Sequence, residues 1–247
     1  RGHCESLVTE SEYQKKALYY WHEQGIDVTS EWVMDYMTGL VPFAWHFNAR
    51  TQEHYLNLPA HVYTGSGINP DVHGSDFGLG FLFGQSMYGE GLWPTWQKNE
   101  TDKQNWDKRF TAKFYLNCLQ YFFLNTLERK SVSGIGDDRI AYFSNGVSVS
   151  LKDSTVSKYD VQLREKNSVI FPVVWKEEPT LAVFSANGGG EKSYQLFGPW
   201  KYFDELGVFE VSISGLKQVG KVRVKDGSIR IELTGGQPYV LKPISDI

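Results

Sequence analysis

The spacing of apolar residues changes along the chain, from about 3.6 before residue 139 to about 2 after it. Before that point, residues with helical spacing include Tyr13, Ala17, Tyr20 and Trp21. After it, short apolar stretches alternate with polar residues and are separated by tight-turn signals such as Asn145-Gly146 and Asp226-Gly227. The pattern predicts an α/β part followed by an all-β part.

A first helix is predicted to begin with Thr9 as its N-cap, because Glu12 follows at the spacing of a capping box. Gly25 is expected just past its end, where a left-handed residue is common. Residues 26–30 are β-prone and form the predicted strand that follows. Glu31 is therefore expected where this strand ends, next to Trp32.

The region 33–100 is rich in Gly, Asn, Pro and aromatic residues, and loops this long are more often functional than decorative. Within it, 55–63 and 77–83 are candidates for a strand or a short helix. A second helix is predicted over 106–130, with the basic residues Arg129 and Lys130 at its C-terminal end. Residues 131–138 are expected to be a linker.

The all-β part contains short stretches of alternating polarity, which predict an antiparallel β-sandwich. The predicted strands are 139–144, 147–151, 159–164, 169–175, 181–186, 208–214, 219–225 and 228–234. We divide the chain accordingly into residues 1–133, read as α/β, and residues 134–247, read as the sandwich.

The charge and composition of the chain argue against some classes of function. The 247 residues carry 25 basic and 29 acidic side chains, a net charge of −4, which argues against nucleic acid as a partner. No apolar run is long enough to cross a membrane, and no signal peptide is present in this chain. Because the sequence begins at Arg1, we expect a fragment or a processed product. Cys4 and Cys118 match no metal spacing, and Cys118 is expected to be an inert core thiol.

A carboxylate beside aromatic residues at a strand end is typical of a general acid that cleaves a sugar linkage. Glu31 is the candidate, with a solvated strand end as the alternative interpretation. Aromatic faces stack on the C–H patches of sugars, so six aromatic and histidine side chains are predicted to line a sugar-binding cleft. Packing in the protein core is an equally good explanation for these side chains. These are Trp32, Tyr36, Trp45, His46, Trp93 and Trp96.

Asp71 and His73 lie in a polar turn segment and are predicted to contact substrate hydroxyls. Turn chemistry alone is the alternative explanation for this segment. Its spacing matches no metal motif, so no metal ligands and no cofactor are predicted, and a structural calcium is left open.

These residues together resemble the bacterial endo-α-N-acetylgalactosaminidases, which are retaining glycoside hydrolases. Their acid/base glutamate lies in a Thr-Thr-Glu-Trp motif that ends a barrel strand, and the motif matches residues 29–32 with one Ser-for-Thr change. Residues 235–243 also look like the closing strand of glycosidase C-terminal β-domains. The resemblance implies a partial (β/α)₈-type barrel followed by an antiparallel sandwich, and a secreted bacterial glycosidase that acts on α-linked amino sugars of glycans.

This chain differs from that family in one respect: it has no clear counterpart of the nucleophilic aspartate. In the family that aspartate lies on the strand before the acid/base strand. The resemblance implies that the nucleophile and the first half of the barrel precede Arg1, so this chain alone is expected to be inactive. The expected partners are a glycan substrate and either the missing half of the barrel or a second copy. The implied location is extracellular, at the cell surface or periplasmic. The alternative is a non-catalytic carbohydrate-binding or cell-surface scaffold protein.

Overall fold

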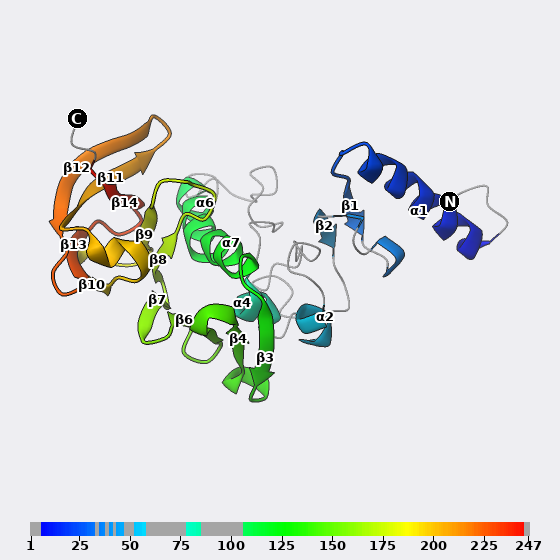
Figure 1. Cartoon of the computed structure of the whole chain (residues 1–247), viewed down its shortest axis with the longest axis horizontal. Coiled ribbons are helices and arrows are strands. Elements are labelled where there is room, and N and C mark those ends of the chain that lie inside the picture. The colour runs from blue at the N-terminus through cyan, green and yellow to red at the C-terminus, as the bar shows by residue number, and fades with distance from the viewer. Residues whose placement is uncertain are drawn as a thin grey trace.

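A computed structural model describes residues 6–32, 35–37, 40–41, 43–46, 52–57, 78–84 and 106–244. Figure 1 shows helix α1 and strands β1 and β2 at one end of the chain's path and a large antiparallel β part at the other. None of the helices in these ranges is long and apolar enough to cross a membrane.

Helix α1 spans Leu7–Glu23, and its N-cap is Ser6, so the prediction of Thr9 was wrong. The Ser6 backbone is extended, which leaves its hydroxyl free to accept a hydrogen bond from the Thr9 N–H at 3.1 Å. The prediction for Gly25 is confirmed: its φ is 71°, and its N–H donates to the His22 carbonyl at 2.9 Å. The Ile26 N–H donates to the Trp21 carbonyl at 3.1 Å, which completes a Schellman motif.

Strand β1 spans Thr29–Trp32 and pairs in parallel with strand β2, Phe43–His46. A short 3-10 helix η1, Asp35–Met37, lies between them. The strand was predicted over 26–30, which is about three residues too early, because Ile26 is still engaged in the end of α1. Glu31 therefore lies inside β1 rather than just beyond it.

In the described residues, two short helices lie between β2 and the second predicted helix. Helix α2 is Gln52–Asn57, and helix α4, Leu79–Phe83, occupies the second of the two ambiguous segments. Leu82 and Phe83 are fully buried, and Leu56 of α2 is partly buried against the same core. The rest of the first ambiguous segment, 58–63, lies outside the described residues.

The second predicted helix is present but contains a π-helix and ends early. It consists of α6 (Trp106–Lys113), the π-helix η5 (Phe114–Cys118) and α7 (Leu119–Asn125). The Thr126 hydroxyl donates to the Phe123 carbonyl at 2.7 Å, and the chain then leaves the helix. Arg129 and Lys130 consequently begin strand β3, Arg129–Ser133, so their predicted place at the helix end was wrong.

Ten strands form one antiparallel sheet in the order β12-β11-β14-β9-β8-β7-β6-β5-β4-β3. From β3 to β9 the order follows the sequence, so neighbouring strands are joined by short turns; β14 then inserts between β9 and β11. Besides β3, the strands are β4 (Ile140–Phe143), β5 (Val147–Ser150), β6 (Thr155–Lys158), β7 (Val161–Glu165), β8 (Ser168–Pro172), β9 (Leu181–Ser185), β11 (Glu205–Ser212), β12 (Gly215–Arg223) and β14 (Tyr239–Pro243).

Strands β10 (Gly190–Gln195) and β13 (Ser228–Leu233) form a separate antiparallel pair. Short 3-10 turns occupy Gly136–Asp138, Ser144–Gly146 and Gly198–Tyr202. The antiparallel all-β prediction is consistent with this arrangement. A partial barrel is not confirmed, because the one parallel pairing in the described residues is β1 with β2.

The hairpin predicted at Asn145-Gly146 is confirmed, because it joins the paired strands β4 and β5. Asp226-Gly227 is a tight turn, but the strands it joins, β12 and β13, belong to different sheets and are linked there by a Lys225–Ser228 bridge, so the prediction of a hairpin at this turn was wrong. Asn145 and Gly146 have φ values of 60° and 70°, and Asp226 and Gly227 have φ values of 51° and 70°. Positive φ at both central residues is the geometry that matches the twist of paired strands, and Asn-Gly and Asp-Gly adopt it most readily.

The core lies between the long helix and the ten-stranded sheet. Phe123 of α7 packs against Phe171 of β8 with ring centroids 5.6 Å apart, and Leu119 and Phe184 are each 1% exposed. Helices η5 and α7 thus share one apolar cluster with strands that follow residue 133. The division of the chain at that residue stays a prediction.

Candidate functional site

The predicted site residues fall into two groups. Glu31 and Trp32 lie on β1, Trp45 and His46 lie on β2, and Tyr36 lies on η1. The other four, Asp71, His73, Trp93 and Trp96, lie outside the described residues. Their roles stay predictions.

The backbone register brings the first group together. Ser30 is opposite Ala44, and Trp32 is opposite His46. Because β1 and β2 are parallel neighbours, their carboxyl ends meet at one edge, which is where α/β barrels assemble their chemistry. Glu31 is the third of the four residues of β1 and comes one position before that edge.

Tyr36 connects η1 to α1. Its hydroxyl donates a hydrogen bond to the Gln14 side-chain carbonyl, and the residue is half-buried. This bond gives the hydroxyl a partner within the protein and fixes η1, the segment between the two strands, against the first helix. The predicted contact of Tyr36 with substrate is not tested by it.

Metal chemistry has no candidate in the part of the chain that the structure describes. No group of three His, Cys, Asp or Glu side chains there is placed to hold a metal ion. Cys118, for which an inert core role was expected, is 2% exposed, and burial raises the pKa of its thiol to about 12. The thiolate needed for nucleophilic or metal chemistry is therefore suppressed at neutral pH.

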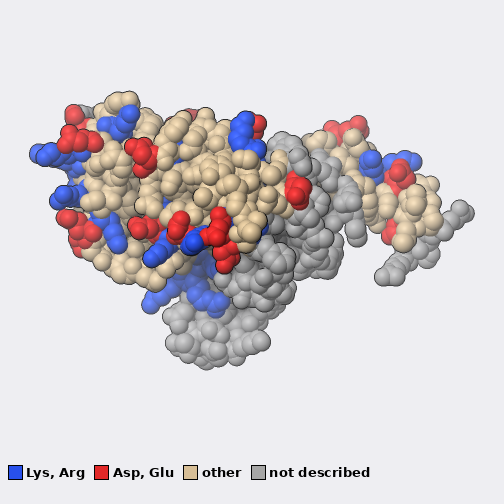
Figure 2. Space-filling model, turned by 90° about the horizontal axis from the view of Figure 1, so that it is seen from below, with Lys and Arg blue, Asp and Glu red and all other residues tan. Residues whose placement is uncertain are grey.

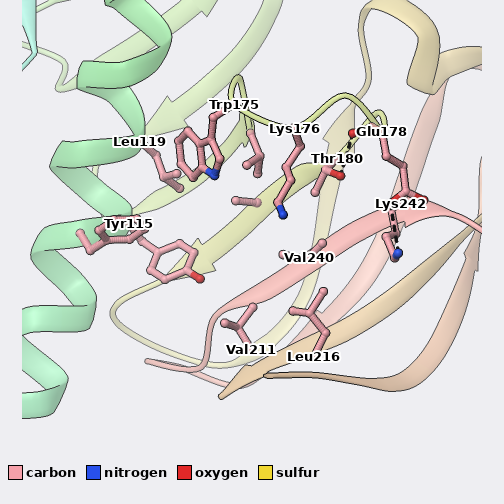
Figure 3. Close-up of a pocket in the computed structure, with 13 residues that line it drawn as sticks. Tyr115, Leu119, Trp175, Lys176, Glu178, Thr180, Val211, Leu216, Val240 and Lys242 are labelled. Carbon is pink, nitrogen blue, oxygen red and sulfur yellow. Dashed lines mark hydrogen bonds and ion pairs between the residues drawn. The ribbon is translucent and has the colours of Figure 1, made fainter. Parts of the chain in front are cut away.

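A pocket that the sequence did not predict lies in the β part, between the long helix and the sheet (Figure 3). Its volume is about 370 Å³, within the range of small-molecule sites. It is lined by Phe114, Tyr115, Leu119, Val173, Trp175, Lys176, Glu178, Thr180, Ala182, Val211, Leu216, Val240 and Lys242. We call this cavity the helix–sheet pocket.

Tyr115 provides a polar atom in the helical wall of the helix–sheet pocket. Its ring stacks on Phe184 with centroids 5.2 Å apart, and the residue is 8% exposed. Figure 3 shows the hydroxyl pointing toward the cavity, and it has no hydrogen-bond partner among the described residues. Burial raises the pKa of Tyr115 to about 12, so the hydroxyl is a neutral donor at pH 7.

The opposite side of the pocket is polar along the segment that follows β8. Glu178 pairs with Lys242 of β14 at 3.1 Å, and the Thr180 hydroxyl donates to the Glu178 carbonyl at 2.9 Å. Lys176 and Trp175 belong to the same segment, and Trp175 is 50% exposed. Phe122 of α7 meets the Trp175 ring edge-on, with centroids 5.1 Å apart, and so holds the indole at the mouth.

Arg164 of β7 hydrogen-bonds to the helix that forms one wall of the pocket. Its guanidinium donates to the Leu116 carbonyl of the π-helix at 2.6 Å and to the Gln120 side-chain oxygen at 2.7 Å. It also donates to the Lys166 carbonyl at 3.0 Å and lies over the Phe81 ring. Burial lowers the pKa of Arg164 to about 10, and these bonds compensate the cost of burying its charge.

The comparisons with known proteins give no family. No family model matches the chain, and no curated protein matches it. The solved structures that it matches include a GH30 endoxylanase from Clostridium papyrosolvens, at 9% identity and a TM-score of 0.23, covering 54% of this chain and 27% of that one. CelM2, a bifunctional glucanase-xylanase from a metagenome library, matches at 10% identity and a TM-score of 0.34 over 96% of this chain and 48% of that one.

An α-amylase from Anoxybacillus matches at 18% identity and a TM-score of 0.23, over 61% of this chain and 25% of that one. All three neighbours are glycoside hydrolases, and the chain spans between about a quarter and a half of their lengths. TM-scores this low do not establish a shared fold.

Proposed function

We propose that this chain is part of a retaining glycoside hydrolase that acts on α-linked amino sugars of glycans, with Glu31 as its general acid and then its general base. The observation that supports the proposal is the parallel pairing of β1 with β2, in which Trp32, the residue after Glu31, is opposite His46. In a retaining mechanism the acid protonates the leaving oxygen, a second carboxylate forms the glycosyl-enzyme, and the first group then activates water.

The nucleophile is proposed to come from sequence outside residues 1–247. Retaining geometry needs two carboxyl groups roughly 5 Å apart. The missing part of the barrel, or a second copy, would also cover the aromatic face of α1, whose Tyr13, Tyr20 and Trp21 are 61%, 56% and 45% exposed. The 247-residue chain by itself is expected to show no turnover.

The test is Glu31→Gln in the complete protein that contains this chain, assayed on aryl α-N-acetylgalactosaminides with good and poor leaving groups. Loss of a general acid should lower kcat/KM on the poor leaving group by about 10²- to 10⁴-fold and affect the good one less. On the substrate with the good leaving group, where breakdown of the glycosyl-enzyme becomes rate-limiting, added azide should restore turnover and yield a glycosyl azide, because a small anion can replace the water that Glu31 activates.

Glu177→Gln is the matched control, since Glu177 is an exposed carboxylate on the surface of the β part. It should leave both substrates unaffected. Full activity of Glu31→Gln on poor leaving groups would remove Glu31 from the role. A loss that is equal for both leaving groups and insensitive to azide would assign Glu31 a structural part instead.

A further inference from the structure

We propose that the helix–sheet pocket is a second glycan-binding site, which takes a pyranose carrying an acetamido group. The site is distinct from the β1–β2 edge, and the inference holds whether or not Glu31 is catalytic. Its basis is a combination of four features in one cavity of about 370 Å³: an exposed indole, an unengaged phenol, an aliphatic wall and a charged polar edge.

The indole supplies the ring-stacking surface. Trp175 is 50% exposed although it contacts Phe122, so one part of its surface is supported by protein and another is open. Covering the exposed part of the indole with an apolar ring face removes apolar surface from water, which lowers the free energy of the complex. A pyranose offers such a face in its C–H groups.

The phenol and the aliphatic wall select for an acetamido group. The Tyr115 hydroxyl is held by the stacked Phe184 ring, points into the cavity and has no acceptor among the described residues. An amide carbonyl is a suitable acceptor for it. The adjoining aliphatic side chains, which suit the acetamido methyl, are Leu119, Ala182, Val211, Leu216 and Val240.

The polar edge suits hydroxyl groups. Glu178 and Lys242 are 45% and 27% exposed as a pair, so each keeps hydrogen-bonding capacity beyond their mutual contact. Lys176 adds ammonium donors at the same edge, and Figure 3 shows its side chain directed toward the cavity. On the face of the molecule shown in Figure 2, acidic and basic side chains are intermixed.

The first experiment titrates the ¹⁵N-labelled chain with free N-acetylgalactosamine and N-acetylglucosamine, using galactose and glucose as comparators. We expect a Kd of about 1 mM for the acetamido sugars, as is usual for ligands of this size. Amide shifts should concentrate at Thr180, Ala182 and Val240, which line the pocket. Equal shifts with galactose and glucose would overturn the acetamido assignment, and no shifts at these residues would overturn the site.

Two variants then test the named contacts. Trp175→Ala should weaken binding about tenfold, because it removes the stacking surface. Tyr115→Phe keeps the stacked ring and removes only the hydroxyl, so it should weaken binding about two- to tenfold. Trp21→Ala is the matched control, since Trp21 is an exposed indole on α1, at 45%, and should leave the affinity unchanged.

Wild-type affinity in both pocket variants would overturn the proposal, as would an equal loss in Trp21→Ala. Glu31→Gln provides the separation from the proposed function. In the complete protein it should lower turnover on poor leaving groups, whereas in the ¹⁵N-labelled chain the shifts at Thr180, Ala182 and Val240 should stay as in the wild type.

Discussion

Helices α1 and α7 both carry apolar residues at helical spacing, but they differ in what covers them. No residue of α1 is buried, and its Tyr20 is 56% exposed. In α7, by contrast, Leu119 and Leu124 are each 1% exposed and pack on the sheet. Since most helical stability in proteins comes from packing an apolar face, the two ends of the described chain should differ strongly in local stability.

The largest expected difference concerns amide hydrogen exchange. Amides of α7 and β9 should exchange at least about 10³-fold more slowly than those in the middle of α1, because a packed helix opens only with its core. Mass spectrometry or NMR exchange on the 247-residue chain checks this. Equal protection of α1 and α7 would contradict it, whereas protection of α1 that appears only in the complete protein would sharpen the proposal that its face is covered there.

The next largest effect is on global stability. Phe171→Ala removes a side chain that is fully buried against Phe123, so it should lower the free energy of unfolding by about 3–5 kcal/mol. Tyr20→Ala, an aromatic truncation on α1, should change it by less than about 0.5 kcal/mol. Denaturant titration followed by near-UV circular dichroism measures both, and similar losses would refute the contrast.

A smaller effect is expected for the polar link between helix and sheet. Gln120→Leu removes the acceptor of Arg164 and the donor to the Phe81 carbonyl, which lies at 2.6 Å. Arg164 keeps the Leu116 and Lys166 carbonyls as acceptors, so the loss of these two hydrogen bonds should cost about 2 kcal/mol of unfolding free energy. Gln162→Leu makes the same change at an exposed position of β7 and is the control. An unchanged denaturation midpoint for Gln120→Leu would show that the link contributes nothing.

The smallest effect distinguishes the observed N-cap of α1 from the predicted one. Ser6→Ala removes the hydroxyl that accepts from the Thr9 N–H and should destabilise the first turn by about 1 kcal/mol. Thr9→Ala leaves that N–H in place and should have the smaller effect. Cα chemical shifts of residues 7–10 report helicity in both variants, and a larger loss in Thr9→Ala would favour the predicted cap.

Features that depend on neighbours in sequence were predicted well. The Asn145-Gly146 hairpin, the tight turn at Asp226-Gly227 and the Gly25 cap follow from backbone preferences of single residues. The end of the second helix was missed because Thr126 closes it through a side-chain bond that has no strong sequence signal. The closing segment was expected to be a strand, but its insertion between β9 and β11 is set by long-range pairing.

The two candidate sites differ in the same way: one depends on neighbours in sequence and the other on long-range packing. The residues on β1 and β2 were predicted because Glu31 and Trp32 are adjacent and resemble a known motif, and their role stays a prediction. The helix–sheet pocket was missed because Tyr115 and Trp175 lie far apart in sequence and meet only through packing. Trp175 gave no usable signal, because it belonged to the strand predicted over 169–175, whereas the observed β8 ends at Pro172.

The π-helix at Phe114–Cys118 makes chain length a determinant of the binding chemistry. A π-helical turn holds about one residue more than an α-helical turn, so losing a single codon within this segment would restore regular winding and change which of its side chains face the sheet. Tyr115 belongs to this segment, so its stacking on Phe184 depends on the extra residue. Homologues one residue shorter here should therefore have lost affinity for acetamido sugars, even where every other lining position is retained.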